Sequence, residues 1–346
     1  MADLNIRNKI LLSLLAISLV PILFITIFAV NITRDALSKR AFSQLKNVRE
    51  VKKDQILTFL NERETDLMIL LETVDGLKQA AFDKLKATQE NKTAQIQTYF
   101  RDIARDVQVI SKNTLITRAL SDFASTIGPD GQADRILYDF FLEERYGQPL
   151  LKLNEIYGYH NLLLVTRAGH VVFSSSNDTL LFKHMTDDGF RGTGLSECFE
   201  SAKRGLSYQD FSRPAADAVA LACVGYPIMK NNGDLSGIMI VQLTSQRINE
   251  ITARREGLGN TGETYLSVKK GDHYVLRSRR HLSNADIGDL VSDPRLKEKL
   301  VLKKAPLIEI SDTGTPEISV HDQIDGLGTT YYLFSHLALK EVIDPR

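Results

Sequence analysis

The sequence contains no tryptophan and two cysteines among its 346 residues. Cys198 and Cys223 are too few for the disulfide framework of a small secreted domain, and they lack the spacing of a metal-binding pair. Free thiols are expected, although a single bridge in an oxidising compartment stays open.

An excess of charge is also absent, because 43 basic residues balance 43 acidic ones. A neutral chain has no bulk electrostatic attraction to nucleic acid, so no nucleic-acid partner is expected. The seven histidines are scattered without the spacing of metal ligands, and the sequence carries no hydrolase, cysteine-protease or kinase signature. We therefore expect a protein that is not an enzyme and that has no metal and no cofactor.

Proline and glycine are nearly missing from a long part of the chain. Between Ile22 and Ile127 there is no proline and one glycine, Gly76, whereas twenty of the twenty-one glycines lie from Gly128 onward. Because these two residue types interrupt regular structure, their absence favours long helices and their return indicates turns. The contrast predicts a domain boundary at Gly128.

What the sequence does have is a long apolar run near its start. Ile10 to Val30 are twenty-one residues without a charge, between Lys9 and Arg34. As a helix this run is about 30 Å long, the thickness of the hydrocarbon core of a bilayer. It is longer than the apolar part of a cleaved signal peptide, about 7 to 15 residues, and no small-residue cleavage site follows it. We therefore expect an uncleaved transmembrane helix over residues 10–31.

Amphipathic helices are predicted between the apolar run and Gly128. Apolar residues recur at a helical spacing from Leu45 to Val74, with charged residues on the other face. The pattern returns after forty residues, because eight residues between positions 45 and 66 recur unchanged between positions 85 and 106. We expect a duplicated helical region over residues 32–127 with a break at Asp75-Gly76. Whether the two copies form a hairpin or one long helix stays open.

From Gly128 onward, short apolar strands alternate with turn residues, and the same order of elements occurs twice. The first set is expected at residues 162–166, 171–174, 195–203 (a helix), 208–211, 218–224 and 237–243, and the second at residues 263–268, 274–277, 294–303 (a helix), 307–310, 318–323 and 330–335. A further helix over residues 245–256 separates the two sets. Each half is predicted to be an open antiparallel sheet with a covered face, in the style of a PAS fold, so the fold class is α+β.

The glycine-rich link between the two halves is not a phosphate-binding loop. Gly257, Gly259 and Gly262 match the spacing of a dinucleotide-binding loop. They follow a helix and precede a strand, which is the reverse of what such a loop needs. The link is therefore expected to connect the two sheets and not to bind a nucleotide.

A small-molecule site is expected in the first half. A pocket needs mostly apolar walls and a few polar groups that fix the ligand's orientation. Aromatic residues with one acid and one or two guanidinium groups suit a carboxylate or a zwitterion. The candidate ligand-binding residues are Tyr138, Arg145, Tyr146, Phe173, Ser174, Tyr208, Asp210, Phe211, Arg213 and Tyr226.

Several stretches resemble the double Cache sensor ectodomains of bacterial transmembrane receptors, chiefly methyl-accepting chemotaxis proteins. They are residues 157–162, 169–173, 210–211, 236–249 and 257–278, and the duplicated helix is similar to the membrane-side region of such receptors. The chain departs from the family pattern at Arg277-Ser278-Arg279-Arg280, where members often have Arg-Ser-Asp-Ser. It also lacks the aromatic and arginine motif of the amino-acid-binding members.

The resemblance implies a membrane-anchored sensor that binds a small molecule and transmits a helix displacement to the membrane. Its expected parts are a cytoplasmic N-terminus (1–9), the transmembrane helix (10–31), the duplicated helical region (32–127), a membrane-distal Cache module (128–256), a membrane-proximal Cache module (257–340) and a truncated end before a second transmembrane helix (341–346). The bulk of the chain would be periplasmic at the inner membrane, in a homodimer. The sensor region of a histidine kinase or cyclase, or a module that binds a partner protein in place of a small molecule, stays open as an alternative.

The predicted dimer makes the first copy of the helical repeat its contact surface. Deletion of residues 45–74 should therefore abolish self-association of the chain in detergent, as measured by light scattering on the purified protein. A dimer that persists after this deletion would contradict the assignment.

Overall fold

The computed structural model describes residues 6–176, 178–213, 218–283, 285–291, 307–310 and 314–343. The chain divides into two compact units, residues 1–74 and 75–346. It combines one long N-terminal helix, α1 (Ile6–Ile110), with shorter helices and two five-stranded antiparallel sheets. The predicted α+β fold class is confirmed.

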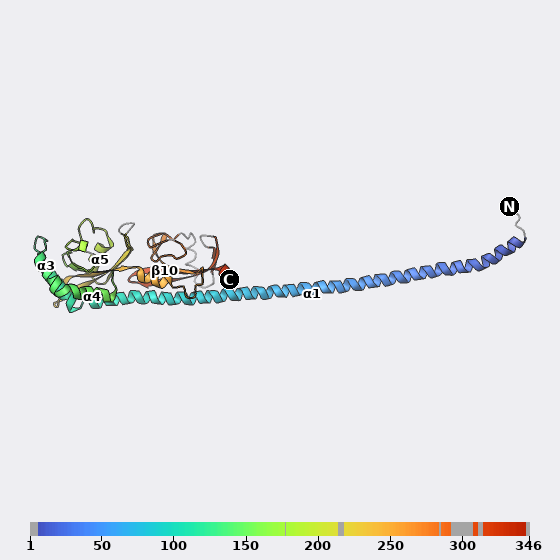
Figure 1. Cartoon of the computed structure of the whole chain (residues 1–346), viewed down its shortest axis with the longest axis horizontal. Coiled ribbons are helices and arrows are strands. Elements are labelled where there is room, and N and C mark those ends of the chain that lie inside the picture. Colours follow the sequence, from blue (N-terminus) through green and yellow to red (C-terminus); the bar gives the residue numbers. More distant parts are fainter. Residues whose placement is uncertain are drawn as a thin grey trace. The chain divides into compact units, whose positions relative to one another are not determined.

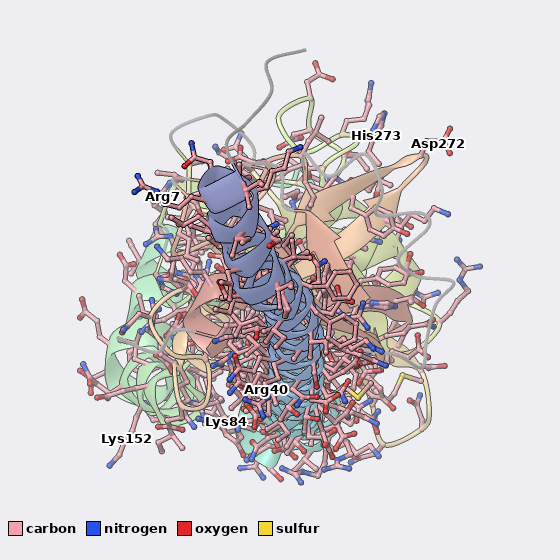
Figure 2. The ribbon with its side chains drawn as sticks, turned by 90° about the vertical axis from the view of Figure 1, so that its right-hand side faces the viewer. Arg7, Arg40, Lys84, Lys152, Asp272 and His273 are labelled. Atoms are coloured by element: carbon pink, nitrogen blue, oxygen red, sulfur yellow. The ribbon has the colours of Figure 1, made fainter. Side chains whose placement is uncertain are left out.

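The first unit consists of the N-terminal part of α1, and it holds the apolar run. Pro21 lies inside the helix, and hydroxyl groups bond back to the helix backbone, with Ser13 donating to the carbonyl of Ile10 at 2.9 Å. Within the described residues, α1 provides the one segment that is long and apolar enough to cross a membrane. Arg7 and Arg40 belong to the same helix and lie on either side of the run (Figure 2).

The expected break between the two copies of the repeat is wrong, because α1 continues through Asp75 and Gly76. Gly76 is exposed, and a single exposed glycine weakens a helix by about 1 kcal/mol without removing a backbone hydrogen bond. The two copies differ in burial instead of secondary structure. Leu85 of the second copy is fully buried, whereas the equivalent Leu45 of the first copy is 65% exposed.

Helices also continue past Gly128, in a stretch for which the sequence pattern predicted none. They are α3 (Arg135–Phe141), the π-helical turn η1 (Leu142–Tyr146) and α4 (Gly147–Tyr157), and they follow α2 (Thr114–Ser125) of the predicted helical region. The side chains of Asn113 and Asp134 cap α2 and α3 by accepting backbone N–H groups. Pro149 lies in the first turn of α4, directly after the π-helical turn η1.

The first sheet has the strand order β2-β1-β5-β4-β3. Its elements are β1 (Asn161–Thr166), β2 (Val171–Ser174), the short helix η2 (Asp178–Leu180), α5 (Gly194–Ala202), β3 (Ser207–Ser212), β4 (Leu221–Met229), β5 (Leu235–Thr244) and α6 (Gln246–Ala253). One face of the sheet packs against α1 and α2, and the other face packs against α5. We call this sheet and its helices the distal module.

The second sheet repeats the same topology, with the strand order β7-β6-β10-β9-β8. Its elements are β6 (Glu263–Lys270), β7 (His273–Leu276), β8 (Leu307–Ile310), β9 (Pro316–Gly326), β10 (Thr329–Ala338) and the short helix α8 (Leu339–Ile343). Asp272 and His273 lie at the tip of the β6–β7 hairpin (Figure 2). The helix expected at residues 294–303 lies outside the described residues. We call this sheet and α8 the proximal module.

β4 differs from its predicted position at residues 218–224, because it extends through Gly225 and Pro227 to Met229. Gly225 packs against α5, where an added Cβ atom would lie 2.8 Å from the Cβ of Ala202. Pro227 lies beyond Ser207, the first residue of β3, so this part of β4 pairs with β5 alone. A sheet accepts proline at such an edge, since no ladder hydrogen bond is lost.

The C-terminal part of α1 packs against both modules, which lie next to each other along it (Figure 1). The ring of Phe100 stacks on Tyr331 of β10, with ring centroids 5.1 Å apart and planes inclined by 14°. It also meets the ring of Tyr208 of β3 edge-on at 6.5 Å. Gly326 of β9 lies directly against the Phe100 ring, where an added Cβ atom would overlap it. One side chain of α1 is therefore in contact with both sheets.

Lys92 fixes α1 to the connection between the modules. Its buried ammonium group donates to the carbonyls of Thr252 and Arg254 at 3.0 and 2.8 Å and to the hydroxyl of Thr264 at 2.9 Å. Burial lowers the pKa of this group to about 8. The end of α6 and the start of β6 are thus both bonded to one residue of α1.

Two glycine substitutions test the packing of α1. Gly326→Ala should destabilise the protein by about 1 to 3 kcal/mol, because the new methyl group overlaps the Phe100 ring. Gly76→Ala is the matched control, since nothing lies within 4 Å of the added Cβ atom. It should leave unfolding unchanged or raise helix stability by up to about 1 kcal/mol. Thermal unfolding followed by circular dichroism measures both effects, and equal midpoints for the two variants would contradict the contact.

Candidate functional site

The ten predicted ligand-binding residues do not form one cluster. Tyr138, Arg145 and Tyr146 lie in the helices after α2; Phe173 and Ser174 lie on β2; Tyr208, Asp210, Phe211 and Arg213 lie on β3 or directly after it; and Tyr226 lies on β4. Whether any of them contacts a ligand stays a prediction. Their surroundings show what each side chain does in the fold.

The helical group forms a filled aromatic cluster around Phe123 of α2. The ring centroids of Tyr138, Tyr146 and Phe173 lie 5.0, 5.6 and 6.1 Å from that of Phe123. The Tyr146 hydroxyl donates to the carboxylate of Asp122 at 2.6 Å. Burial and the bond to Asp122 raise the pKa of Tyr146, so its hydroxyl stays protonated.

Of the other predicted residues, Arg145 is exposed to solvent, whereas Phe211 and Tyr226 belong to the core or pack against it. Arg145 is half-exposed and lies 3.7 Å from the same Asp122 carboxylate. Phe211 is buried in the main core, and the partly buried Tyr226 packs against that core. These contacts stabilise the module on the face of the sheet that α1 and α2 cover.

Asp210 forms the centre of a polar cluster between the two modules, which we call the junction. Its carboxylate lies 2.6 Å from the guanidinium of Arg277, whose side chain is 1% exposed. The hydroxyl of Tyr331 donates to the same carboxylate at 3.1 Å and lies 2.6 Å from the hydroxyl of Tyr208. The distal module supplies Tyr208 and Asp210, and the proximal module supplies Arg277 and Tyr331.

The two junction tyrosines act as protonated hydroxyl groups. Burial is the main reason that the pKa values of Tyr208 and Tyr331 are raised, and the negative charge of Asp210 adds to it. A buried guanidinium requires a paired charge, because removal of one member of a buried ion pair costs about 3 to 5 kcal/mol. Asp210 and Arg277 therefore hold the two modules in one relative position.

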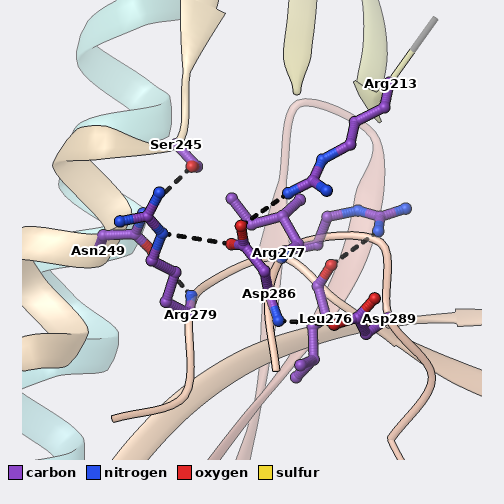
Figure 3. A network of polar contacts seen from close by, with 9 residues as sticks. Arg213, Ser245, Asn249, Leu276, Arg277, Arg279, Asp286 and Asp289 are labelled. Carbon is purple, nitrogen blue, oxygen red and sulfur yellow. Dashed lines mark hydrogen bonds and ion pairs between the residues drawn. The ribbon is translucent and has the colours of Figure 1, made fainter. Parts of the chain in front are cut away.

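A second ion-pair network joins the modules beside the junction (Figure 3). The carboxylate of Asp286 lies between Arg213, at 2.8 Å, and Arg279, at 3.3 Å. The backbone N–H of Arg279 in turn donates to the side-chain oxygen of Asn249 on α6 at 2.9 Å. Burial alone would raise the pKa of Asp286, but the N–H of Ile287 and the two guanidinium groups lower it.

The third arginine of the run has its own buried partner inside the proximal module. Arg280 donates to Glu263 at 2.6 Å, and the backbone N–H groups of His281 and Leu282 donate to the other carboxylate oxygen at 2.8 and 2.9 Å. His336 lies 3.3 Å from the same carboxylate. Each arginine in Arg277-Ser278-Arg279-Arg280 thus faces a different acid.

A row of neutral polar side chains crosses the distal sheet on the face that α5 covers. Asn161, Gln242, Cys223 and Gln209 are successive cross-strand partners on β1, β5, β4 and β3. Asn161 donates to Gln242 at 3.1 Å, and Ser174 of β2 donates to Asn161 at 3.2 Å. We call these five residues the polar row. It brings one predicted residue, Ser174, together with four that the sequence analysis did not select.

Asn161 fixes the chain where it leaves β2. Its side-chain oxygen accepts the backbone N–H groups of Ser175 and Ser176 at 3.0 and 3.2 Å. The chain then continues into the segment that packs with α5 over this face, through Met185 and Phe190. A polar row beneath an apolar cover gives the combination that a small-molecule site requires.

The sequence contains a feature that could have identified Asn161 and Gln242. Asn161 begins a strand that is otherwise apolar, and Gln242 interrupts the apolar run from Ile238 to Leu243. A polar residue at an inward strand position must find a hydrogen-bond partner, so it marks either an internal network or a ligand contact. Cross-strand register was needed to place these residues in one row.

Neither a protein-family model nor a curated protein sequence matches the chain. Its fold is similar to solved sensor domains. The ligand-binding domain of the Pseudomonas fluorescens chemoreceptor CtaA in complex with L-leucine is 15% identical, with 78% of this chain and 100% of that chain covered and a TM-score of 0.46. The ligand-binding domain of the Campylobacter jejuni chemoreceptor Tlp3 in complex with 4-methylisoleucine is 12% identical, with 79% and 94% covered and a TM-score of 0.48.

A sensor domain of a histidine kinase is similar to the same extent. The V. cholerae DctB sensor domain is 14% identical, with 74% of this chain and 97% of that chain covered and a TM-score of 0.49.

Glu263 provides a test of the buried ion pairs through pH. Burial alone would raise its pKa, but the bonds from His336 and the N–H of Leu282, with the charge of Arg280, lower it to about 2. A lowered carboxyl pKa stabilises the fold above the unfolded value of about 4.3, and this contribution is lost as the pH falls through about 2. Glu263→Gln should therefore cost about 3 kcal/mol at pH 7 and almost nothing near pH 2.

Thermal unfolding of both proteins between pH 2 and pH 7 measures this difference. Glu197→Gln is the control, because Glu197 lies in the first turn of α5, away from the arginine run. A pH-independent difference between wild type and Glu263→Gln would show that the carboxylate charge does not stabilise the fold.

Proposed function

We propose that the chain is the extracytoplasmic ligand-sensing region of a bacterial transmembrane receptor of the chemoreceptor type. A small polar molecule, of the carboxylate or zwitterion class, binds in the distal module between the polar row and the cover formed by α5 and the segment before it. Binding shifts β3, and β3 displaces α1 at the junction. The helix carries the displacement toward the membrane.

The observation that carries this proposal is the alternation of side chains along β3. Gln209 belongs to the polar row on the α5 face. Its neighbours Tyr208 and Asp210 lie at the junction, where Tyr208 meets Phe100 of α1 and Asp210 pairs with Arg277. Tyr208 and Gln209 pair in register with β4 and point to opposite faces, and the register shifts only after Gln209, so one strand connects the ligand side of the sheet with the helix side.

The junction can have two arrangements, one with the Asp210–Arg277 ion pair formed and one with it broken. A buried ion pair with two tyrosine hydroxyls is either formed or broken, since intermediate geometries leave charges unpaired. A ligand moves the equilibrium only by its difference in affinity for the two arrangements, typically about 1 to 3 kcal/mol. That energy is of the same order as the hydrogen bonds of the junction.

The surface of the first unit supports a membrane-anchored homodimer. The apolar run is exposed along its whole length, as expected for a helix that lipid surrounds. Beyond the run, apolar residues of the first repeat copy, among them Leu45, Ile56, Phe59 and Leu67, are also exposed in the single chain. A second copy of the chain would cover this stripe through helix–helix packing.

Two variants separate binding from transmission. A thermal-shift screen of amino acids and small carboxylates on the detergent-solubilised chain should find a stabilising ligand, with a gain of about 2.7 kcal/mol at a hundred times its dissociation constant. Gln242→Leu should remove this gain, whereas Gln148→Leu, a change at an exposed position of α4, should keep it. A gain that survives Gln242→Leu would place the ligand elsewhere.

Asp210→Asn tests the junction. It should keep the stabilising effect of the ligand but remove the ligand-induced change in hydrogen exchange of residues 96–107 of α1. Loss of the stabilising effect itself would make Asp210 a ligand contact, and an unchanged exchange response would exclude the junction from transmission.

A further inference from the structure

A second binding site is indicated on the opposite face of the distal module. A groove of about 530 Å³ lies between α1, the turn after α4 and α6, and its walls include Tyr99, Asp102, Asp106, Tyr157, Tyr159 and Arg247. An adjoining hollow of about 360 Å³ shares the three tyrosines and Arg247 and adds Glu250. The hollow is also lined by Leu243, which is on the other side of β5 from Gln242. The groove is therefore separate from the polar row.

The hydroxyl of Tyr159 has no partner in this groove. Tyr159 is 8% exposed, and its hydroxyl oxygen is buried without a hydrogen bond. Burial is the main reason that the pKa of this hydroxyl is raised, and Asp106, Tyr157 and Tyr99, which all line the groove, add to the effect. An unpaired buried hydroxyl destabilises the fold, and a donor that reached it from the groove would remove that cost.

Three tyrosines line the groove. The rings of Tyr157 and Tyr159 stack with centroids 5.7 Å apart and planes inclined by 12°. Tyr99 faces them from α1, and its pKa is raised to about 12 by burial. Three neutral phenol rings in one groove attract a cation through the negative faces of their π systems.

The charged side chains of the lining also favour a cation. Asp102, Asp106 and Glu250 supply three carboxylates, and Arg247, the one basic side chain in the two linings, pairs with Glu250 at 2.9 Å. Asp102 and Asp106 pair with Arg105 at 3.1 and 3.2 Å, but the Arg105 side chain is 63% exposed, and such surface pairs contribute little. The carboxylates can exchange this partner for a bound cation.

We propose that this groove binds a small organic cation that carries a primary ammonium group, as a second ligand site of the chain. The ammonium group donates to the Tyr159 hydroxyl and to the carboxylate of Asp106. The aliphatic part of the ligand lies on the rings of Tyr99 and Tyr157. This site goes beyond the proposed sensing of a carboxylate or zwitterion and does not depend on it.

Isothermal titration of the detergent-solubilised full chain with 1,4-diaminobutane tests the site. Binding should be absent for 1,4-butanediol, which has the same length and no charge. Asp106→Asn and Tyr159→Phe should each weaken diamine binding by about tenfold, because each removes one hydrogen bond to a charged group. Asp188→Asn is the control, since the Asp188 side chain is 96% exposed and lies outside the groove.

Tyr159→Phe also separates a binding role from a structural one. It should leave the unfolding midpoint of the free protein unchanged or raise it, because it removes an unpaired buried hydroxyl. Equal binding of diamine and diol, no diamine binding, or diamine binding that both groove variants retain would overturn the proposal. Diamine binding that Gln242→Leu abolishes and Asp106→Asn leaves intact would assign the cation to the distal site and likewise overturn the groove.

Discussion

The structure of the larger unit depends on the packing of one helix against two sheets at a single side chain. Phe100 stacks on Tyr331 from the proximal module and meets Tyr208 from the distal module. Gly326 is required beside it because any larger residue would overlap the ring. This contact positions both sheets along the helix, and the Asp210–Arg277 pair fixes the sheets relative to each other. Lys92 adds the polar counterpart by bonding α1 to the chain that links them.

The arginine run shows how charge is used to fix this arrangement. Arg277 and Arg279 face acids that hold the two modules together, with Asp210 and Arg213 contributed by β3 and its end. Arg280 instead serves the interior of the proximal module through Glu263. Neighbouring arginines of one loop therefore have different roles. Arg277 and Arg279 help to join the modules, and Arg280 stabilises the proximal module. The glycine-rich link is held in a similar way, since the carboxylate of Glu341 accepts the backbone N–H groups of Asn260 and Thr261 at 2.6 and 2.7 Å.

The order of elements along the chain and the repetition of the module followed from the sequence because alternation and turn residues are local signals. The helices between residues 135 and 157 could not be predicted from the sequence. Glycine and proline occur at helix starts as well as in turns, and Gly147 and Pro149 lie at the start of α4. Asp210 was selected as a polar group near a ligand, yet it pairs with Arg277 from sixty-seven positions away. Such pairings are set by how two sheets meet, and no single-sequence pattern encodes that meeting. Asn161 and Gln242 were visible as polar interruptions, but their alignment needed the register of three strands.

The alternation along β3 has an evolutionary consequence. Gln209 and the pair Tyr208 and Asp210 lie on opposite faces, so mutations at one face leave the chemistry of the other in place. Side chains on the α5 face and side chains at the junction can therefore change independently by substitution. Insertion or deletion of one residue within the paired stretch 207–209 has a different effect, because it exchanges the two faces in one step. The length of this short stretch is therefore more constrained than its side chains.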